Sequence, residues 1–272
     1  YYGTTSQEAG LWVRGKAKDG TTRFYRVATA YVILRGLRVT LAIRFVLPED
    51  DTVAILGILL QRLEKLRIDV RRLLLDKGFA GIAVMAYLSQ RKLPALIACP
   101  IRGRTGGTRA LCRGNKSYTT RHTFKGQNKR AFTADLAVCR AFTTARRTGR
   151  MKRRACWLVF ILINLDLPPR QARRLYRRRF GVETGYRCAG RVRGWTTSRN
   201  PAYRFALIGL SFFLLNVWLH LRWLYTQVPR RGCRHLDSKR FELTRFSRFI
   251  ARALEQNYGC VREIVAPAAP RP

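Results

Sequence analysis

Residues 176–187 read Tyr-Arg-Arg-Arg-Phe-Gly-Val-Glu-Thr-Gly-Tyr-Arg. Ten arginines lie between positions 170 and 199, and Glu183 is the only acidic residue among them. On a helix with about 100° of rotation per residue, four side chains of this stretch share one narrow face. They are Tyr176, Arg179, Glu183 and Arg187.

The same stretch has an apolar side that favours a helix packed on a core. Leu175, Val182 and Tyr186 form a stripe next to the face that carries Glu183. One carboxylate with cations a turn away suits a metal ligand beside phosphate-binding groups. A surface glutamate paired with arginines at i±4 spacing is the commoner arrangement, so both interpretations stay open at this point.

Charge limits the kinds of partner. The 272-residue chain has a net charge of +39, which makes a polyanion the expected partner. Hydrophobic residues make up 47% of it, enough for a packed core and too many for a disordered basic tail. Ribosomal RNA and membrane surfaces are the other usual targets of such charge, but ribosomal proteins are seldom this long and apolar.

Cysteine usage indicates the compartment. Seven cysteines are dispersed without a Cys-x-x-Cys pair, and with only three histidines no zinc-ligand spacing results. Such a set is typical of reduced thiols in a cytoplasmic protein. The sequence shows no signal peptide.

Residues 1–101 are predicted to alternate strands and helices. Residues 24–34 and the strictly alternating residues 39–47 should pair as a hairpin. Residues 52–67 repeat apolar side chains at helical spacing, and Asp50 or Asp51 can cap that helix.

A short strand over residues 70–75 is predicted to end on Asp76. A helix over 80–90 and a strand over 93–100 follow. Open α/β sheets bind ligands at the carboxyl ends of their strands, which makes Asp76 a candidate ligand. A turn-forming aspartate explains the same residue equally well.

Residues 102–154 differ from the rest of the chain in amino-acid composition. They contain sixteen Lys and Arg and a single acid, Asp135, with four aromatic residues among them. Frequent Gly, Thr and Asn predict short strands and turns. This composition indicates an inserted, basic, β-rich segment with a nucleic-acid surface, because a merely soluble face would carry balancing acids.

The remainder is predicted to return to the core and then to become helical. Residues 157–165 form an apolar strand, and Asp166-Leu-Pro-Pro starts the helix that carries Tyr176 and Glu183. Residues 205–224 are interpreted as a buried helix, because three polar residues interrupt them; a membrane span is the alternative. The sequence further predicts a loop over 191–200, a basic linker over 227–238, a helix over 241–254 and a disordered C-terminal end.

In its order of elements the chain resembles the DDE transposases of bacterial and archaeal insertion sequences. Within them it is similar to the group with a β-strand insertion and a Tyr-x2-Arg-x3-Glu signature, here Tyr176-x2-Arg179-x3-Glu183-x3-Arg187. The closing arginine is typical of the halobacterial-type variant. Leu73-Leu-Leu-Asp76-Lys-Gly-Phe79 and Arg199-Asn-Pro are also similar to motifs of this group.

The resemblance implies an α/β, ribonuclease-H-like core, C-terminal helices and metal-dependent cleavage and transfer of DNA strands. The implied segments are 1–101 and 155–226 for the core, 102–154 for the insertion, and 227–272 for the basic linker and tail. Asp76 and Glu183 would be catalytic ligands of two Mg²⁺ or Mn²⁺ ions. Tyr176, Arg179 and Arg187 would contact DNA, copies of the chain would self-associate on it, and no membrane is involved.

One departure concerns the first aspartate of the family, which precedes a Tyr-Tyr-Gly-like segment. This chain opens on Tyr1-Tyr2-Gly3, so we expect a truncated transposase that lacks the first ligand and therefore has little or no catalytic activity. Glu8 and Asp19 lie in polar or glycine-rich sequence and are not accepted as substitutes. The alternatives are a non-catalytic DNA-binding remnant and a basic membrane-associated protein.

Overall fold

In the computed structural model the described residues are 11–18, 21–34, 36–104, 106–126, 130–147, 150–198, 200–230, 233–237 and 240–259. The chain divides into two compact units. The first holds the described residues of Tyr1–Tyr31 and Leu41–Glu183, and the second those of Val32–Thr40 and Thr184–Pro272.

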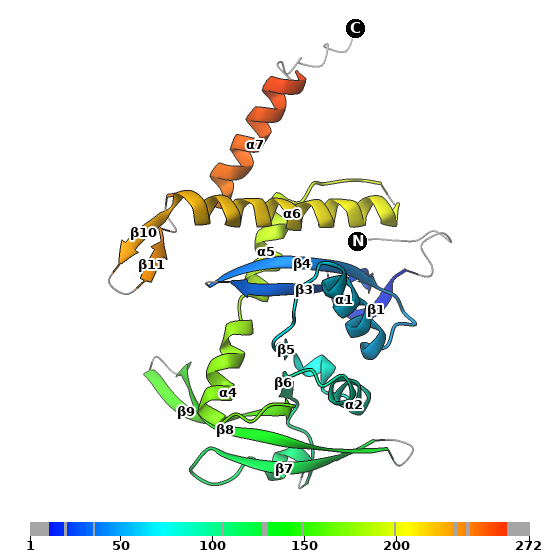
Figure 1. The fold of residues 1–272 in the computed structure, drawn as a ribbon, viewed down its shortest axis with the longest axis vertical. Coiled ribbons are helices and arrows are strands. Elements are labelled where there is room, and N and C mark those ends of the chain that lie inside the picture. Colours follow the sequence, from blue (N-terminus) through cyan, green and yellow to red (C-terminus); the bar gives the residue numbers. More distant parts are fainter. Residues whose placement is uncertain are drawn as a thin grey trace. The chain divides into compact units, whose positions relative to one another are not determined.

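A five-stranded mixed sheet organises the first unit, in the order β5-β6-β9-β8-β7 (Figure 1). Only β5 and β6 run parallel to each other. The strands of this sheet are β5 (Leu73–Leu75), β6 (Ala95–Cys99), β7 (Tyr118–Lys125), β8 (Ala131–Arg147) and β9 (Arg150–Ile163). The remaining strands of the unit are β1 (Val13–Lys18), β2 (Thr21–Phe24) and parts of β3 (Arg26–Leu34) and β4 (Leu37–Val46).

Helices cover both faces of the sheet because side chains alternate along each strand. On one face, Ile97 and its neighbours pack against α1 (Thr52–Lys65) and α2 (Ile82–Gln90). On the other, Leu96 and Phe160 pack against α4 (Pro169–Tyr176). The prediction of an α/β fold is confirmed at this level.

The start of α1 shows how the sequence sets a boundary. Asp51 is the N-cap, and its Oδ1 accepts a hydrogen bond from the backbone N–H of Ala54 at 2.6 Å. Asp50, the other candidate cap, instead pairs with Arg44 at 2.6 Å.

Replacing Asp51 by Ala is therefore expected to destabilise the protein by about 1 kcal/mol, the usual cost of losing a helix cap. Urea unfolding of both proteins measures the difference. Glu49→Ala, an exposed neighbour with the same loss of charge, should change little; an equal effect of both substitutions would mean that net charge, not the cap, is responsible.

The prediction of short strands within residues 102–154 is wrong. β8 has 17 residues, and β9 has 14 and joins the basic residues from Arg150 to the apolar strand in one element. Backbone pairing does not depend on side-chain polarity, so the change in composition near residue 155 does not end a strand. A four-residue helix, α3 (Gly107–Ala110), precedes β7.

Residues 176–187 do not form one continuous helix. α4 ends at Tyr176, a 3₁₀ turn η4 spans Arg177–Arg179, and α5 (Val182–Val192) starts anew. Gly181 separates them with φ of 113°, a conformation that a residue with a Cβ adopts only under strain. The single narrow face expected for Tyr176 to Arg187 is therefore wrong, and so is the continuous stripe through Leu175 and Tyr186.

The second unit is built on α6 (Pro201–Tyr225), whose N-cap Asn200 accepts hydrogen bonds from Ala202 and Tyr203. The side-chain amide of Asn216 bonds both the N–H and the carbonyl of Thr40, at 3.0 and 2.7 Å. α7 (Leu243–Tyr258) is joined to α6 by the indole of Trp218, which donates to the carbonyl of Phe241.

Burial of α6 is incomplete. Phe212 and Leu215 are buried, while Phe213 is 62% exposed, so the prediction of a buried helix holds for one face only. By length and composition alone, α6 is also long and apolar enough to cross a membrane. Residues 227–238, expected as a linker, instead contain the antiparallel pair β10 (Gln227–Arg230) and β11 (Cys233–Leu236). The C-terminal end beyond residue 259 lies outside the described residues.

Candidate carboxylate site

Asp76 follows β5 directly, at the carboxyl end of a strand parallel to β6. Its Oδ1 accepts a hydrogen bond from the N–H of Gly78 at 2.8 Å and so caps the 3₁₀ turn η2 (Lys77–Phe79). A Cβ on Gly78 would lie 3.0 Å from that oxygen, so glycine permits this close approach. The turn-forming role is thus real, and it occupies one of the two carboxylate oxygens.

Glu183 lies in the first turn of α5, where the helix dipole favours a carboxylate. Its side chain is 63% exposed and pairs with Arg179, with 3.7 Å between Oε1 and the guanidinium nitrogen. This separation is longer than a hydrogen bond, so the carboxylate remains accessible to another ligand.

Arg179 is held more tightly than its partner. Its side chain is 16% exposed. The guanidinium lies over the rings of Tyr176 and Phe180, 5.4 and 5.9 Å from their centroids. Its backbone carbonyl accepts a hydrogen bond from the Tyr31 hydroxyl of β3 at 3.1 Å. Among the described residues, its Nε is buried without a hydrogen-bond partner, which leaves a donor for a ligand.

Tyr176 links the two acids. Its ring is buried against Phe160, 4.9 Å between centroids, which gives it a packing role. Burial raises the pKa of the hydroxyl, Arg179 lowers it, and the negative charges of Asp76 and Glu183 both raise it. Two carboxylates separated by more than one hundred residues in sequence thus act on one hydroxyl group.

This arrangement predicts a titration. Asp76→Asn and Glu183→Gln should each lower the pKa of Tyr176, because each removes a negative charge that opposes phenolate formation. ¹³C-labelled tyrosine NMR, with Tyr176→Phe to assign the signal, measures it. Asp135→Asn, an exposed acid paired with Arg121, should leave the pKa unchanged; unchanged values in both test variants would disprove the grouping.

The structure therefore brings Tyr176, Arg179 and Glu183 into contact, and Asp76 is connected to them only through the effect of its charge on the pKa of Tyr176. Arg187 belongs to the second unit and is exposed on α5. Glu8, Asp19 and Arg199 lie outside the described residues.

Asp76 and Glu183 have the donor atoms that suit a divalent metal ion. Carboxylate oxygens are the donors that Mg²⁺ and Mn²⁺ prefer, and Asp76 and Glu183 supply two of them. Within the described ranges, no group of three or more His, Cys, Asp or Glu could hold a metal ion. The donor chemistry fits, with two protein ligands rather than three.

Sequence reasoning missed the surroundings of Asp76. A hollow of about 670 Å³ is lined by Lys77 and Gly78, the two residues that follow Asp76. Four cations of its lining come from four separate segments, namely Lys77 of η2, Arg102 after β6, Arg173 of α4 and Arg177 of η4. Only the general excess of Lys and Arg pointed to them, because no motif predicts that these positions converge.

The first unit is thus a mixed α/β unit with one candidate acid at a strand end and another at a helix start, and cations lie near both. Residues 8–217 match the family described as the transposase DDE domain, and because they make up most of the chain, the chain belongs to that family. DNA is the partner that a transposase domain implies. No curated protein matches the chain in sequence.

Proposed function

We propose that the chain is a DNA transposase that cleaves and transfers strands for an insertion sequence, with Asp76 and Glu183 as metal ligands. The observation that carries the proposal is that, inside a transposase DDE domain, Glu183 pairs with an Arg179 guanidinium that lies over the Tyr176 ring, while Asp76 stands at the end of β5. Either acid alone has an ordinary explanation, as a turn residue or as an ion pair. A turn-forming Asp76 and an ion-paired Glu183 would have no need to lie in the same domain region near Tyr176.

Mg²⁺ or Mn²⁺ would be held by the carboxylates of Asp76 and Glu183. When bound, such ions activate water or a 3′-hydroxyl for attack on phosphorus and neutralise the developing charge. Gly78 orients the Asp76 carboxylate through its N–H, and the start of α5 stabilises the Glu183 carboxylate.

Arg179 is proposed to bind a DNA phosphate next to these ligands. Its buried Nε lacks a partner among the described residues, and a guanidinium offers several parallel donors to phosphate oxygens. The hydroxyl of Tyr176 and the exposed guanidinium of Arg187 are proposed as further DNA contacts. Since the ring of Tyr176 is buried, its contact would be made by the hydroxyl and not by base stacking.

The finer architecture is part of the proposal. The core would be ribonuclease-H-like, divided over residues 1–101 and 155–226, with 102–154 as an insertion and 227–272 as an appended tail. Its strands β7 and β8 extend the sheet of β5 and β6, as an insertion into a sheet can. The Tyr-x2-Arg-x3-Glu subgroup, self-association on DNA and a cytoplasmic location are likewise proposed.

DNA binding and strand cleavage test the function separately. Binding to duplex DNA should weaken steeply with salt, because phosphate contacts release counterions. Mn²⁺ should then support nicking or strand transfer on the same DNA. Without salt-dependent binding the transposase proposal fails.

A non-catalytic DNA-binding remnant is the second candidate, favoured by the presence of two rather than three grouped acids in the described part of the chain. It predicts DNA binding with no cleavage in any divalent metal. The third candidate is a membrane-associated protein built on α6, which would be soluble only in detergent. The hydrogen bonds of Asn216 to the backbone of Thr40 favour packing of α6 within the protein instead.

A further inference from the structure

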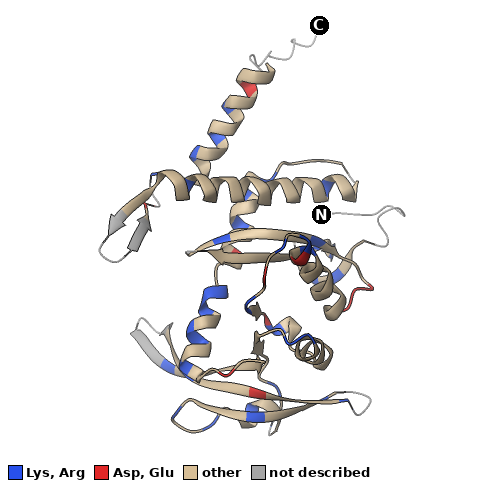
Figure 2. Ribbon diagram, viewed as in Figure 1, with Lys and Arg blue, Asp and Glu red and all other residues tan. Residues whose placement is uncertain are grey.

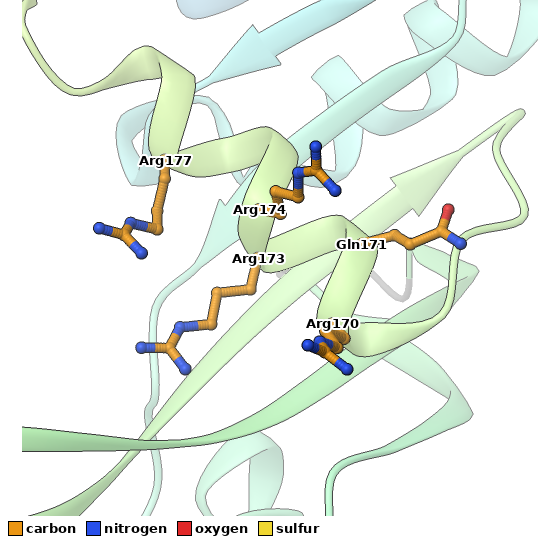
Figure 3. A pocket seen from close by; sticks show the side chains of 5 residues that line it. All are labelled: Arg170, Gln171, Arg173, Arg174 and Arg177. Carbon is orange, nitrogen blue, oxygen red and sulfur yellow. The ribbon is translucent and has the colours of Figure 1, made fainter.

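A row of arginines on α4 and at the first position of η4 is not explained by the carboxylate site. Arg170, Gln171, Arg173, Arg174 and Arg177 line a hollow of about 450 Å³ (Figure 3). Figure 3 shows Arg173 and Arg177 extending to the same side of the helix. At about 100° per residue, positions 170, 173 and 177 fall within one narrow arc.

Nothing in the described part of the chain balances this charge. Residues 169–180 contain no acid, and Figure 2 shows α4 with basic residues and no acidic one. No ion pair among the described residues involves Arg170, Arg173, Arg174 or Arg177. Like charges three and four residues apart oppose helix formation, so this helix carries repulsion that a bound anion would relieve.

Packing fixes the row in place. The opposite side of α4 is buried through Ala172 and Tyr176 against Leu96 and Phe160 of the sheet. The helix cannot turn its arginines inward, and they stay on its outer side. Arg173 and Arg177 also line the hollow next to Asp76, which includes Lys77 and Gly78. The row therefore leads toward the candidate metal ligands.

We propose that Arg170, Arg173 and Arg177 bind consecutive backbone phosphates of the DNA strand that leads to Asp76 and Glu183. This inference rests on the proposed DNA-binding function and adds a site to it. Seven residues of helix rise by roughly 10 Å. One strand of duplex DNA presents a phosphate about every 3.4 Å along its axis, so the row spans about three phosphate-to-phosphate steps.

The chain provides a matched control in α7. Arg245, Arg248 and Arg252 are exposed and have the same i, i+3, i+7 spacing. Replacing either set by Gln removes three charges from one helix face. Both variants lose the same number of positive charges, so the general attraction to DNA weakens equally in both. A difference between them in DNA affinity therefore reports direct contact with DNA.

The experiment measures duplex DNA affinity between low and moderate salt for wild type and both triple variants. The α4 variant should lower the slope of log affinity against log salt by about 3, since each duplex phosphate contact contributes about 0.9. The α7 variant should change the slope by less than about 1. Arg→Lys at the three α4 positions should retain the slope, because the charge remains. Thermal unfolding checks that Arg173, which is half-buried, tolerates Gln.

Methylphosphonate substitution locates the contact. Neutral phosphates introduced one at a time should weaken wild-type binding at about three adjacent positions, and these positions should no longer matter in the α4 variant. Equal slopes for the α4 and α7 variants would overturn the inference while leaving DNA binding intact. Absence of salt-dependent binding in wild type would instead overturn the proposed function.

Discussion

Replacing Asp76 by Asn, or Glu183 by Gln, is expected to lower the rate of metal-dependent cleavage strongly while leaving the fold and DNA binding in place. Each change keeps the size of the side chain and removes one charged metal ligand. A bound metal contributes several kcal/mol of transition-state stabilisation, so a loss of about 3 kcal/mol lowers the rate on the order of 100-fold. Mn²⁺ affinity, measured by calorimetry, should fall about tenfold or more in the same variants.

The controls are chosen to have the same chemistry. Asp135→Asn removes a carboxylate at an exposed position of β8, and Glu64→Gln removes one that pairs with Arg91 at 2.8 Å. Neither should change cleavage or Mn²⁺ affinity. Full Mn²⁺ affinity in both Asp76→Asn and Glu183→Gln would rule out these residues as ligands, whatever the activity.

Arg179→Lys is expected to lower cleavage strongly although it keeps the positive charge. The guanidinium lies over two rings, pairs with Glu183 and has an Nε without a hydrogen-bond partner in the described part of the chain. An ammonium group reproduces neither the flat stacking nor the parallel donors. Loss of one such transition-state contact costs about 3 kcal/mol, on the order of 100-fold in rate. Single-turnover kinetics with DNA measures it.

Arg91 offers a control with similar contacts. Its guanidinium lies 5.6 Å from the centroid of the Tyr87 ring, bonds the Tyr87 hydroxyl at 2.7 Å and pairs with Glu64. The Arg91 cluster is exposed and contains none of the candidate site residues. Arg91→Lys should leave cleavage unchanged; an equal loss in both lysine variants would indicate a general effect on folding.

Local signals in the sequence predicted much of the first unit. The 3.6-residue spacing from Thr52, the alternation before Pro48 and the Pro-Pro start of α4 each act within a few residues. Asp76 was placed correctly after a strand for the same reason. These features depend on neighbours in sequence, and so periodicity and capping reveal them.

The rest depends on contacts that are distant in sequence. The break at Gly181 was missed because the spacing of Tyr176, Arg179 and Glu183 fits a helix whether or not the chain forms one. The convergence of Lys77, Arg102 and Arg173 follows from the sheet order, which periodicity does not reveal. β10 and β11 were missed since basic residues masked their strand character.

The conformation of Gly181 has a genetic consequence. Every single-nucleotide change of a glycine codon that alters the residue adds a Cβ, and at φ of 113° a side chain costs about 1–3 kcal/mol of strain. Relief of that strain would shift the start of α5, and Glu183 with it. In a random mutagenesis screen, position 181 should therefore be recovered among inactive variants as Asp76 and Glu183 are, although it contributes no chemical group.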